Sequence, residues 1–192
     1  MTLSSLCERL VGWFSENKRE LPFRGSGDPY AILVSETMAQ QTRMSALVPY
    51  YNRFIARFPD VRSLAGADEA DVLALWAGLG YYARARALHR TAKAVLSGWG
   101  GSLPADADAL RSLPGIGAYT AGAVASVAFN LPVPAVDGNV RRVYSRLFAS
   151  GGGDVSGWVR SLMDNAPPRL VTEGLMELGA LVCTPASPKC GS

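Results

Sequence analysis

The sequence predicts an all-α protein, and two observations lead to that prediction. Apolar residues recur at helical spacing along most of the chain, beginning with a stripe of Leu3, Leu6, Leu10, Trp13 and Phe14. No stretch has a convincing strand pattern, and no internal repeat is visible. With 192 residues, 48% of them hydrophobic, the chain can bury a core as one domain or as two small lobes.

The first two expected helices differ in character. Residues 3–16 form an amphipathic helix with Ser4 or Ser5 near its start. A glycine-containing turn follows. Asp28-Pro29 is a typical helix start, and it leads into an apolar helix over residues 30–41.

The next helices are delimited by caps and glycines. Asp60 and Asp68 are expected N-caps, and Gly78-Leu79-Gly80 separates two helices. The expected helical ranges are 42–58, with a restart near Pro49, and then 61–65, 69–76, 81–96 and 105–112.

The segment Leu113-Pro114-Gly115-Ile116-Gly117 joins two expected helices through a turn without side-chain bulk. Pro114 fixes one φ angle, and Gly115 and Gly117 permit positive φ and a close approach of another backbone. The following helix, residues 118–129, therefore begins with unpaired backbone N–H groups that can bind an anion such as a DNA phosphate. An ordinary corner between two helices fits the same pattern, so both interpretations stay open here.

About twenty residues later, Asp137 leads into an expected helix over residues 137–149. Gly151-Gly152-Gly153 is expected to be a flexible connection, and the last helices are expected over 154–165 and 168–182.

Glu36 lies in the apolar second helix, where burying an unpaired carboxylate is costly. This conflict between a residue and its surroundings marks a functional candidate. A glutamate on a solvent-facing side of the helix is the alternative.

Composition permits DNA binding without requiring it. The net charge is only +3, but 16 of the 19 basic residues are arginine, which pairs bidentately with phosphate. Neither a membrane span nor a signal peptide is visible, so we expect a protein of the cytoplasm or nucleoid with no membrane partner. The three cysteines do not make a disulfide framework.

The hairpin, with Tyr119-Thr120-Ala121-Gly122-Ala123 behind it and Val136-Asp137-Gly138-Asn139-Val140 downstream, resembles the helix-hairpin-helix DNA glycosylase superfamily, of the endonuclease III type. The details most resemble the adenine DNA glycosylases of the MutY type, from about Leu21 to Cys190. The resemblance implies two lobes with the active cleft between them. Residues 22–132 would form a six-helix bundle with the helix-hairpin-helix at about 105–129, and residues 1–21 would join 133–192 in the second lobe.

Cutting the bond between a purine and its deoxyribose requires an acid for the leaving base and a carboxylate near the developing sugar cation. By resemblance, Glu36 is the acid, and the ionised Asp137 stabilises the cation or bonds to it briefly. A simple N-cap is the alternative for Asp137. Bifunctional relatives carry an attacking lysine where this chain has Tyr119. We therefore expect a monofunctional enzyme in which Tyr119 packs against the flipped nucleotide or hydrogen-bonds Glu36 or Asp137.

The resemblance also assigns residues to DNA and to the extruded base. Gln41, with Thr42 beside the opposite base, would fill the vacancy left by the flipped nucleotide. The remaining assignments are Leu79 and Tyr81 to a second wedge, Gly115, Ile116 and Gly117 to phosphate, and Arg19, Arg24 and Glu173 to the adenine pocket.

Cys183 and Cys190 resemble the first two ligands of the family's iron–sulfur motif, and a [4Fe–4S] cluster needs four thiolates. The third ligand would fall one residue beyond Ser192, and Cys7 is expected in the core. We therefore expect a [4Fe–4S] cluster in the full-length protein but no intact cluster in this chain, which we interpret as a truncated piece. A short form without a cluster is the alternative.

The resulting hypothesis is a base excision repair enzyme, acting as a monomer, that removes adenine mispaired with 8-oxoguanine or guanine from double-stranded DNA. One alternative is a thymine–guanine mismatch glycosylase of the same superfamily. Another is a non-catalytic DNA-binding module that uses the hairpin as a phosphate clamp.

Overall fold

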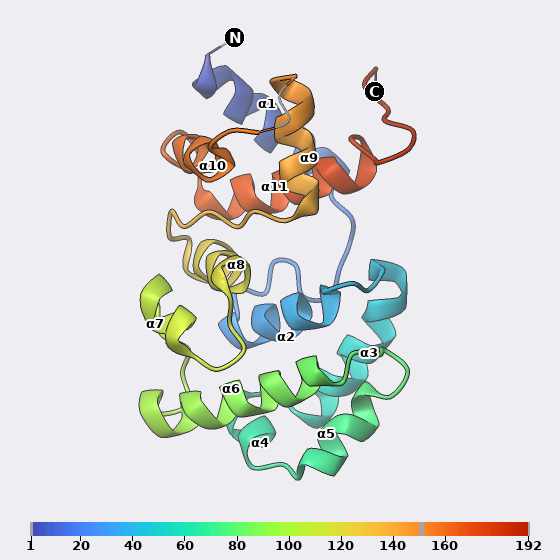
Figure 1. Cartoon of the computed structure of the whole chain (residues 1–192), viewed down its shortest axis with the longest axis vertical. Coiled ribbons are helices and arrows are strands. Elements are labelled where there is room, and N and C mark those ends of the chain that lie inside the picture. Colours follow the sequence, from blue (N-terminus) through green and yellow to red (C-terminus); the bar gives the residue numbers. More distant parts are fainter. Residues whose placement is uncertain (1, 150–151, 192) are drawn as a thin grey trace. The chain divides into compact units, whose positions relative to one another are not determined.

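Helices are the regular elements of the described part of the chain, residues 2–149 and 152–191 of a computed structural model, and no strand occurs within these residues (Figure 1). The all-α prediction is confirmed. The helices are α1 (Leu3–Asn17), α2 (Pro29–Ala39), α3 (Met44–Arg57), α4 (Val61–Ala65), α5 (Glu69–Trp76), α6 (Ala83–Trp99), α7 (Ala107–Ser112), α8 (Ala118–Phe129), α9 (Gly138–Leu147), α10 (Val155–Met163) and α11 (Pro168–Leu181).

Aspartates begin several of these helices, because a side-chain carboxylate can accept a hydrogen bond from an otherwise unpaired first-turn N–H group. Asp28 accepts from the Tyr30 amide, and Asp60 accepts from the Ser63 amide within a full capping box. Such a cap contributes about 1 kcal/mol. The helix start predicted at Asp28-Pro29 and the cap predicted at Asp60 are confirmed, whereas Asp68 precedes α5 without a side-chain cap bond.

Several expected boundaries were wrong, among them the start of the helix expected over 81–96, which begins only at Ala83. Thr2, not a serine, caps α1, because its hydroxyl accepts from the Ser5 amide. The helix expected over 30–41 ends at Ala39, and the one expected over 42–58 begins only at Met44, because Gln41 between them takes a left-handed φ of 59°. Pro49 lies inside α3, and the helix does not restart there. It is on an exposed face, where water can donate a hydrogen bond to the carbonyl that lacks its usual backbone donor. Residue 151 of the connection expected at 151–153 lies outside the described residues.

The chain forms two compact units, and residues Glu20–Val124 make the first. In this unit α6 packs against α2, α4 and α5, and α2 and α5 each pack against α3. Aromatic rings fill its core: Phe54 meets Phe58 at 5.2 Å and Trp76 at 5.9 Å between ring centroids, both edge-on. These rings are fully buried, and burying one such side chain contributes about 1.5–3 kcal/mol.

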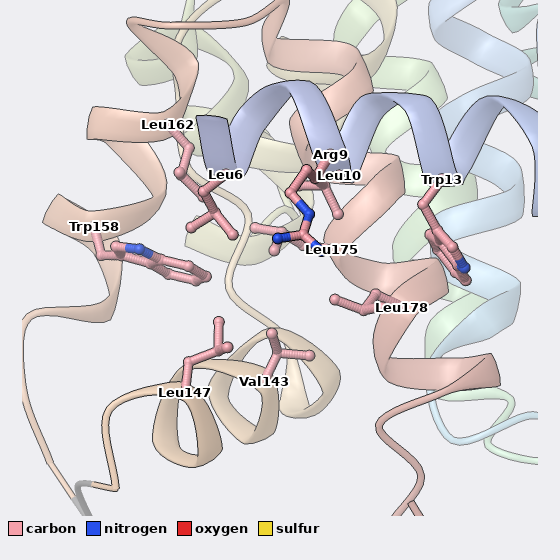
Figure 2. A pocket seen from close by; sticks show the side chains of 10 residues that line it. All are labelled: Leu6, Arg9, Leu10, Trp13, Val143, Leu147, Trp158, Leu162, Leu175 and Leu178. Carbon is pink, nitrogen blue, oxygen red and sulfur yellow. The ribbon is translucent and has the colours of Figure 1, made fainter. Parts of the chain in front are cut away.

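The second unit combines Met1–Arg19 with Ala125–Ser192. Its core holds Cys7, as predicted, together with residues of α9, α10 and α11. An apolar groove of about 240 Å³ opens on this unit (Figure 2). Its lining residues are Leu6, Arg9, Leu10, Trp13, Val143, Leu147, Trp158, Leu162, Leu175 and Leu178.

None of the described helices combines the length and the apolar character that crossing a lipid bilayer requires.

Candidate active site

Glu36 and Tyr119 meet in the Glu20–Val124 unit. The phenol Oη of Tyr119 donates a hydrogen bond to Oε2 of Glu36 at 2.7 Å, and the contact is partly buried. Glu36 comes from the middle of α2 and Tyr119 from the first turn of α8. Of the interactions expected for Tyr119, the hydrogen bond to Glu36 is therefore present.

Glu36 is the single charged side chain in α2. Its neighbours Ser35 and Thr37 are buried, and their hydroxyls donate to carbonyls of the same helix, those of Ile32 and Leu33. These two hydroxyls are used within α2, and Tyr119 reaches the carboxylate from another helix. A half-buried carboxyl group next to a phenol can hold or release a proton, as an acid catalyst must.

The hairpin beside Tyr119 is built for close backbone contact. Gly115 has a φ of 86°, and a Cβ at that position would lie 2.7 Å from the Cβ of Ala87 in α6. Ile116 is buried and anchors the turn. The backbone N–H groups of Gly115 and Gly117 donate to no other described residue, and both residues are exposed. This arrangement can bind an anion.

Asp137 lies in the other unit as the N-cap of α9. Its Oδ1 accepts from the Val140 amide at 2.8 Å, and its Oδ2 accepts from the side-chain amide of Asn139 at 2.8 Å. The positive end of the helix dipole favours a negative charge at this position. The capping role is thus present, and it leaves a second lone pair on each oxygen for a cationic neighbour.

The proposed wedge residues lie in two loops of the Glu20–Val124 unit. Gln41 and Tyr81 are exposed, and both have left-handed backbones, with φ of 59° and 51°. Thr42 is half-buried. Leu79 is buried, at 9% exposure, whereas Tyr81 is 62% exposed. A contact from Leu79 to DNA would therefore require its loop to move, while Tyr81 is already accessible.

The residues expected in a base pocket already have protein partners. The guanidinium of Arg19 donates from Nε and Nη2 to the carboxylate of Glu177, each at 2.8 Å, and Glu177 is 1% exposed. Glu173 pairs with Arg169 of the preceding turn at 3.4 Å. Arg24 is half-buried in the loop before α2. Sequence reasoning missed Glu177, although a glutamate within the apolar run of α11 was a visible signal.

The thiols present do not fit a [4Fe–4S] cluster. Cys183 and Cys190 are free, and Cys7 is buried in the core, where its thiol lies 3.5 Å from the carbonyl of Leu162. Within residues 2–149 and 152–191, no three His, Cys, Asp or Glu side chains form a metal-holding group. Around Cys183, Arg142 instead donates to the backbone carbonyl, at 2.6 Å, and Arg146 lies 3.4 Å from the sulfur.

Comparisons with known proteins agree with this architecture. The family described as "HhH-GPD superfamily base excision DNA repair protein" matches residues 34–168. Adenine DNA glycosylase of Mus musculus is 41% identical over 198 residues, covering 94% of this chain and 38% of that protein. Adenine DNA glycosylase of Mycolicibacterium smegmatis is 43% identical over 191 residues, covering 95% and 64%.

The chain thus spans between about a third and two thirds of the length of these curated relatives. A solved structure of a thermostable thymine-DNA glycosylase is 25% identical, with a TM-score of 0.90, and the match covers 99% of this chain and 91% of that one. The family match covers well over half of the residues and includes Glu36, the hairpin and Asp137. The chain therefore belongs to the HhH-GPD superfamily of base excision DNA repair proteins.

Proposed function

We propose that this chain is a monofunctional DNA glycosylase that releases adenine mispaired with 8-oxoguanine or guanine in double-stranded DNA. The observation that carries the proposal is the hydrogen bond from Tyr119, on the helix that follows the glycine hairpin, to Glu36 of α2. The identity to adenine DNA glycosylases over almost the whole chain supports adenine as the base. We further propose that it acts as a monomer on DNA of the cytoplasm or nucleoid.

In this mechanism Glu36 protonates a ring nitrogen of the extruded adenine. The hydrogen bond from Tyr119 to Oε2 holds the carboxyl group of Glu36 in place while it gives up its proton. As the N-glycosidic bond breaks, its electron pair leaves with the protonated base, and the sugar develops cationic character. Asp137 stabilises that cation electrostatically. Water then adds to the sugar carbon and gives up a proton to a carboxylate.

The residue at position 119 sets the reaction type. A lysine amine could attack the sugar and form a Schiff base, which leads to strand cleavage. A phenol with an ordinary pKa near 10 is a poor nucleophile at neutral pH. Since the proton of Tyr119 is also shared with Glu36, we propose base release without strand cleavage.

The hairpin and two exposed loops provide the proposed contacts with DNA. The backbone N–H groups at Gly115 and Gly117 would hold a phosphate, and Gln41 and Tyr81 would enter the base stack. Arg24 and Glu173 would line the adenine pocket. We assign Arg19 to anchoring Glu177 rather than to the base, because its guanidinium is already engaged.

The test is single-turnover base release from duplexes that carry one A·8-oxoguanine, A·G or T·G pair. We expect adenine release, with strand breaks appearing only after alkali. Glu36→Gln should lower the release rate at least about 10²–10⁴-fold, the usual contribution of a general acid, while DNA affinity changes little. Glu16→Gln, at an exposed position of α1, is the matched control.

Release of thymine from T·G in place of adenine would support the thymine glycosylase alternative. Salt-dependent DNA binding by the unaltered protein without release of any base would support the non-catalytic module.

A further inference from the structure

Arg84 lies in the first turn of α6, between the two exposed loops to which the proposed function assigns DNA contacts. One loop follows α2 and carries Gln41 and Thr42. The other, residues 78–82, follows α5 and carries Tyr81. All of these residues belong to the Glu20–Val124 unit.

The guanidinium of Arg84 holds the end of α2. Its Nη1 lies 3.2 Å from the carbonyl oxygen of Thr37 and 3.0 Å from that of Met38, and it also contacts the carbonyl oxygen of Gln40. Carbonyls at a helix C-terminus lack intrahelical donors and carry partial negative charge, so a cation stabilises them. The hydroxyl of Thr42 lies 3.4 Å from both Nη1 and Nη2.

The same guanidinium holds the second loop. Its Nη2 donates to the carbonyl of Gly80 at 3.1 Å and lies 3.4 Å from that of Leu79. Its Cζ atom lies 5.7 Å from the ring centroid of Trp76 and 5.3 Å from that of Tyr81. Trp76 is fully buried and also donates from Nε1 to the Gly80 carbonyl, so this loop is fixed to the core of its unit.

The two loops share a strained backbone feature. Gln41 and Tyr81 both have left-handed φ angles, which for a residue other than glycine cost on the order of 1 kcal/mol or more. Arg84 binds the carbonyl of the peptide immediately before each one, that of Gln40 and that of Gly80. One side chain therefore fixes the peptide planes that lead into both exposed residues.

We propose that Arg84 is a positioning residue that presents Gln41 and Tyr81 to DNA as one rigid pair. This inference rests on the proposed function, because it takes these two side chains as the ones that enter the base stack. Lysine cannot replace arginine in this role, since a single ammonium group cannot reach both sets of carbonyls in the fixed planar geometry of a guanidinium.

The first test measures amide hydrogen exchange in the free protein, comparing Arg84→Lys with Arg86→Lys. Arg86 lies on the same helix but pairs with Glu69 at 3.0 Å on the surface. We expect Arg84→Lys to raise exchange in residues 40–43 and 78–82 together, and Arg86→Lys to leave both loops unchanged. A rise in one loop alone, or in neither, would overturn the coupling.

The second test is a mutant cycle on DNA. Arg84→Lys should weaken affinity for an A·G duplex and slow base release by about ten- to hundredfold, as expected for the loss of one or two charge-assisted hydrogen bonds. If Arg84 acts through Gln41 and Tyr81, the same substitution should have almost no further effect in a Gln41→Ala, Tyr81→Ala background. An undiminished effect in that background would show a general structural role and overturn the proposal.

The exchange experiment uses no DNA and no turnover, so it decides the coupling even if the protein releases no adenine. In that case the mutant cycle is evaluated from DNA affinity alone. If Arg84→Lys does not fold, Arg84→Gln, which keeps one planar amide donor, takes its place in the exchange experiment. A rise in exchange in residues 40–43 and 78–82 together supports the coupling, and a rise in one loop alone or in neither contradicts it.

Discussion

At the scale of a single residue, His89 is the one histidine of the chain and is almost completely buried in α6. Its Nε2 has no hydrogen-bond partner among the described residues. Burial lowers the pKa of His89 below its ordinary value of 6.5, and the charge of Lys93 acts in the same direction. Hydrogen bonds to the backbone of Ala67 and Ala65, and the charge of Glu69, oppose this shift without cancelling it.

The folded state therefore favours the neutral form of the His89 imidazole. An unfolded chain takes up a proton near pH 6.5, whereas the folded chain takes it up only at lower pH. The free energy of unfolding should thus fall as the pH drops from about 7.5 through 6.5 towards the lowered pKa of the folded state. Urea unfolding midpoints at pH 7.5, 6.5 and 5.5 check this expectation.

His89→Gln is the matched variant, because it keeps a polar side chain but does not titrate. It should show a flatter pH dependence across that interval. An equally steep decline in the variant would mean that other groups are responsible.

At the scale of an element, the hairpin between α7 and α8 contains two glycines whose side-chain positions differ in backbone conformation and in available space. Gly115 combines a positive φ with a Cβ site only 2.7 Å from the side chain of Ala87. Gly117 has no positive φ, and a Cβ there would have no neighbour within 4 Å. The first glycine is required by the fold of the turn. The second is not, so any requirement for it comes from a ligand that approaches the backbone.

We expect Gly115→Ala to lower the melting temperature, because it adds both backbone strain and a clash with α6. Gly117→Ala should leave the melting temperature nearly unchanged and still weaken DNA binding, because the added methyl group would crowd a phosphate held at this exposed backbone. Thermal unfolding and fluorescence anisotropy with a labelled duplex measure the two effects. Full DNA affinity in Gly117→Ala would argue against phosphate binding at this turn.

At the scale of the whole molecule, one unit is assembled from both ends of the chain. Arg19, just after α1, donates to Glu177 of α11 from its backbone amide, Nε and Nη2, and these residues are 158 positions apart. The carboxylate is 1% exposed, whereas the Arg19 side chain is 36% exposed. The buried Glu177 carboxylate therefore needs Arg19 as its partner, whereas water can reach Arg19 without Glu177.

Arg19→Met should destabilise the protein more than Glu177→Gln. The first change strips two charge-assisted hydrogen bonds from a buried carboxylate, and breaking such a pair costs about 3–5 kcal/mol. The second leaves a neutral amide buried and an arginine that water can reach, so its cost should be nearer 1–2 kcal/mol. Chemical unfolding of both variants gives the comparison. The reverse order would contradict the assignment of Glu177 as the desolvated partner.

The features that could be predicted from the sequence were local ones. Asp28 was recognisable as a helix start and Asp60 as a cap, because each accepts from an amide only a few residues away. The hairpin was recognisable because proline and glycine restrict or free the backbone wherever they occur. The family motifs around Glu36 and Asp137 were equally contiguous.

The features that could not be predicted depend on distant partners. Arg84 resembled any basic residue on an exposed helix, and only the folded chain brings it to carbonyls more than forty positions away. The Gly78-Leu79-Gly80 stretch indicated a loop but not that Leu79 would turn inward while Tyr81 stayed outside. The break before Met44 was hidden because Gln40 and Gln41 carry no strong helix-breaking signal.

The division between the two units falls inside α8, between Val124 and Ala125, and not in a connecting loop. Cutting the gene at that boundary would sever a continuous helix, leaving orphaned carbonyls on one fragment and orphaned amides on the other. A split-protein reporter or a separately expressed fragment should therefore be divided beyond Phe129, so that the whole helix stays with the piece that contains Tyr119.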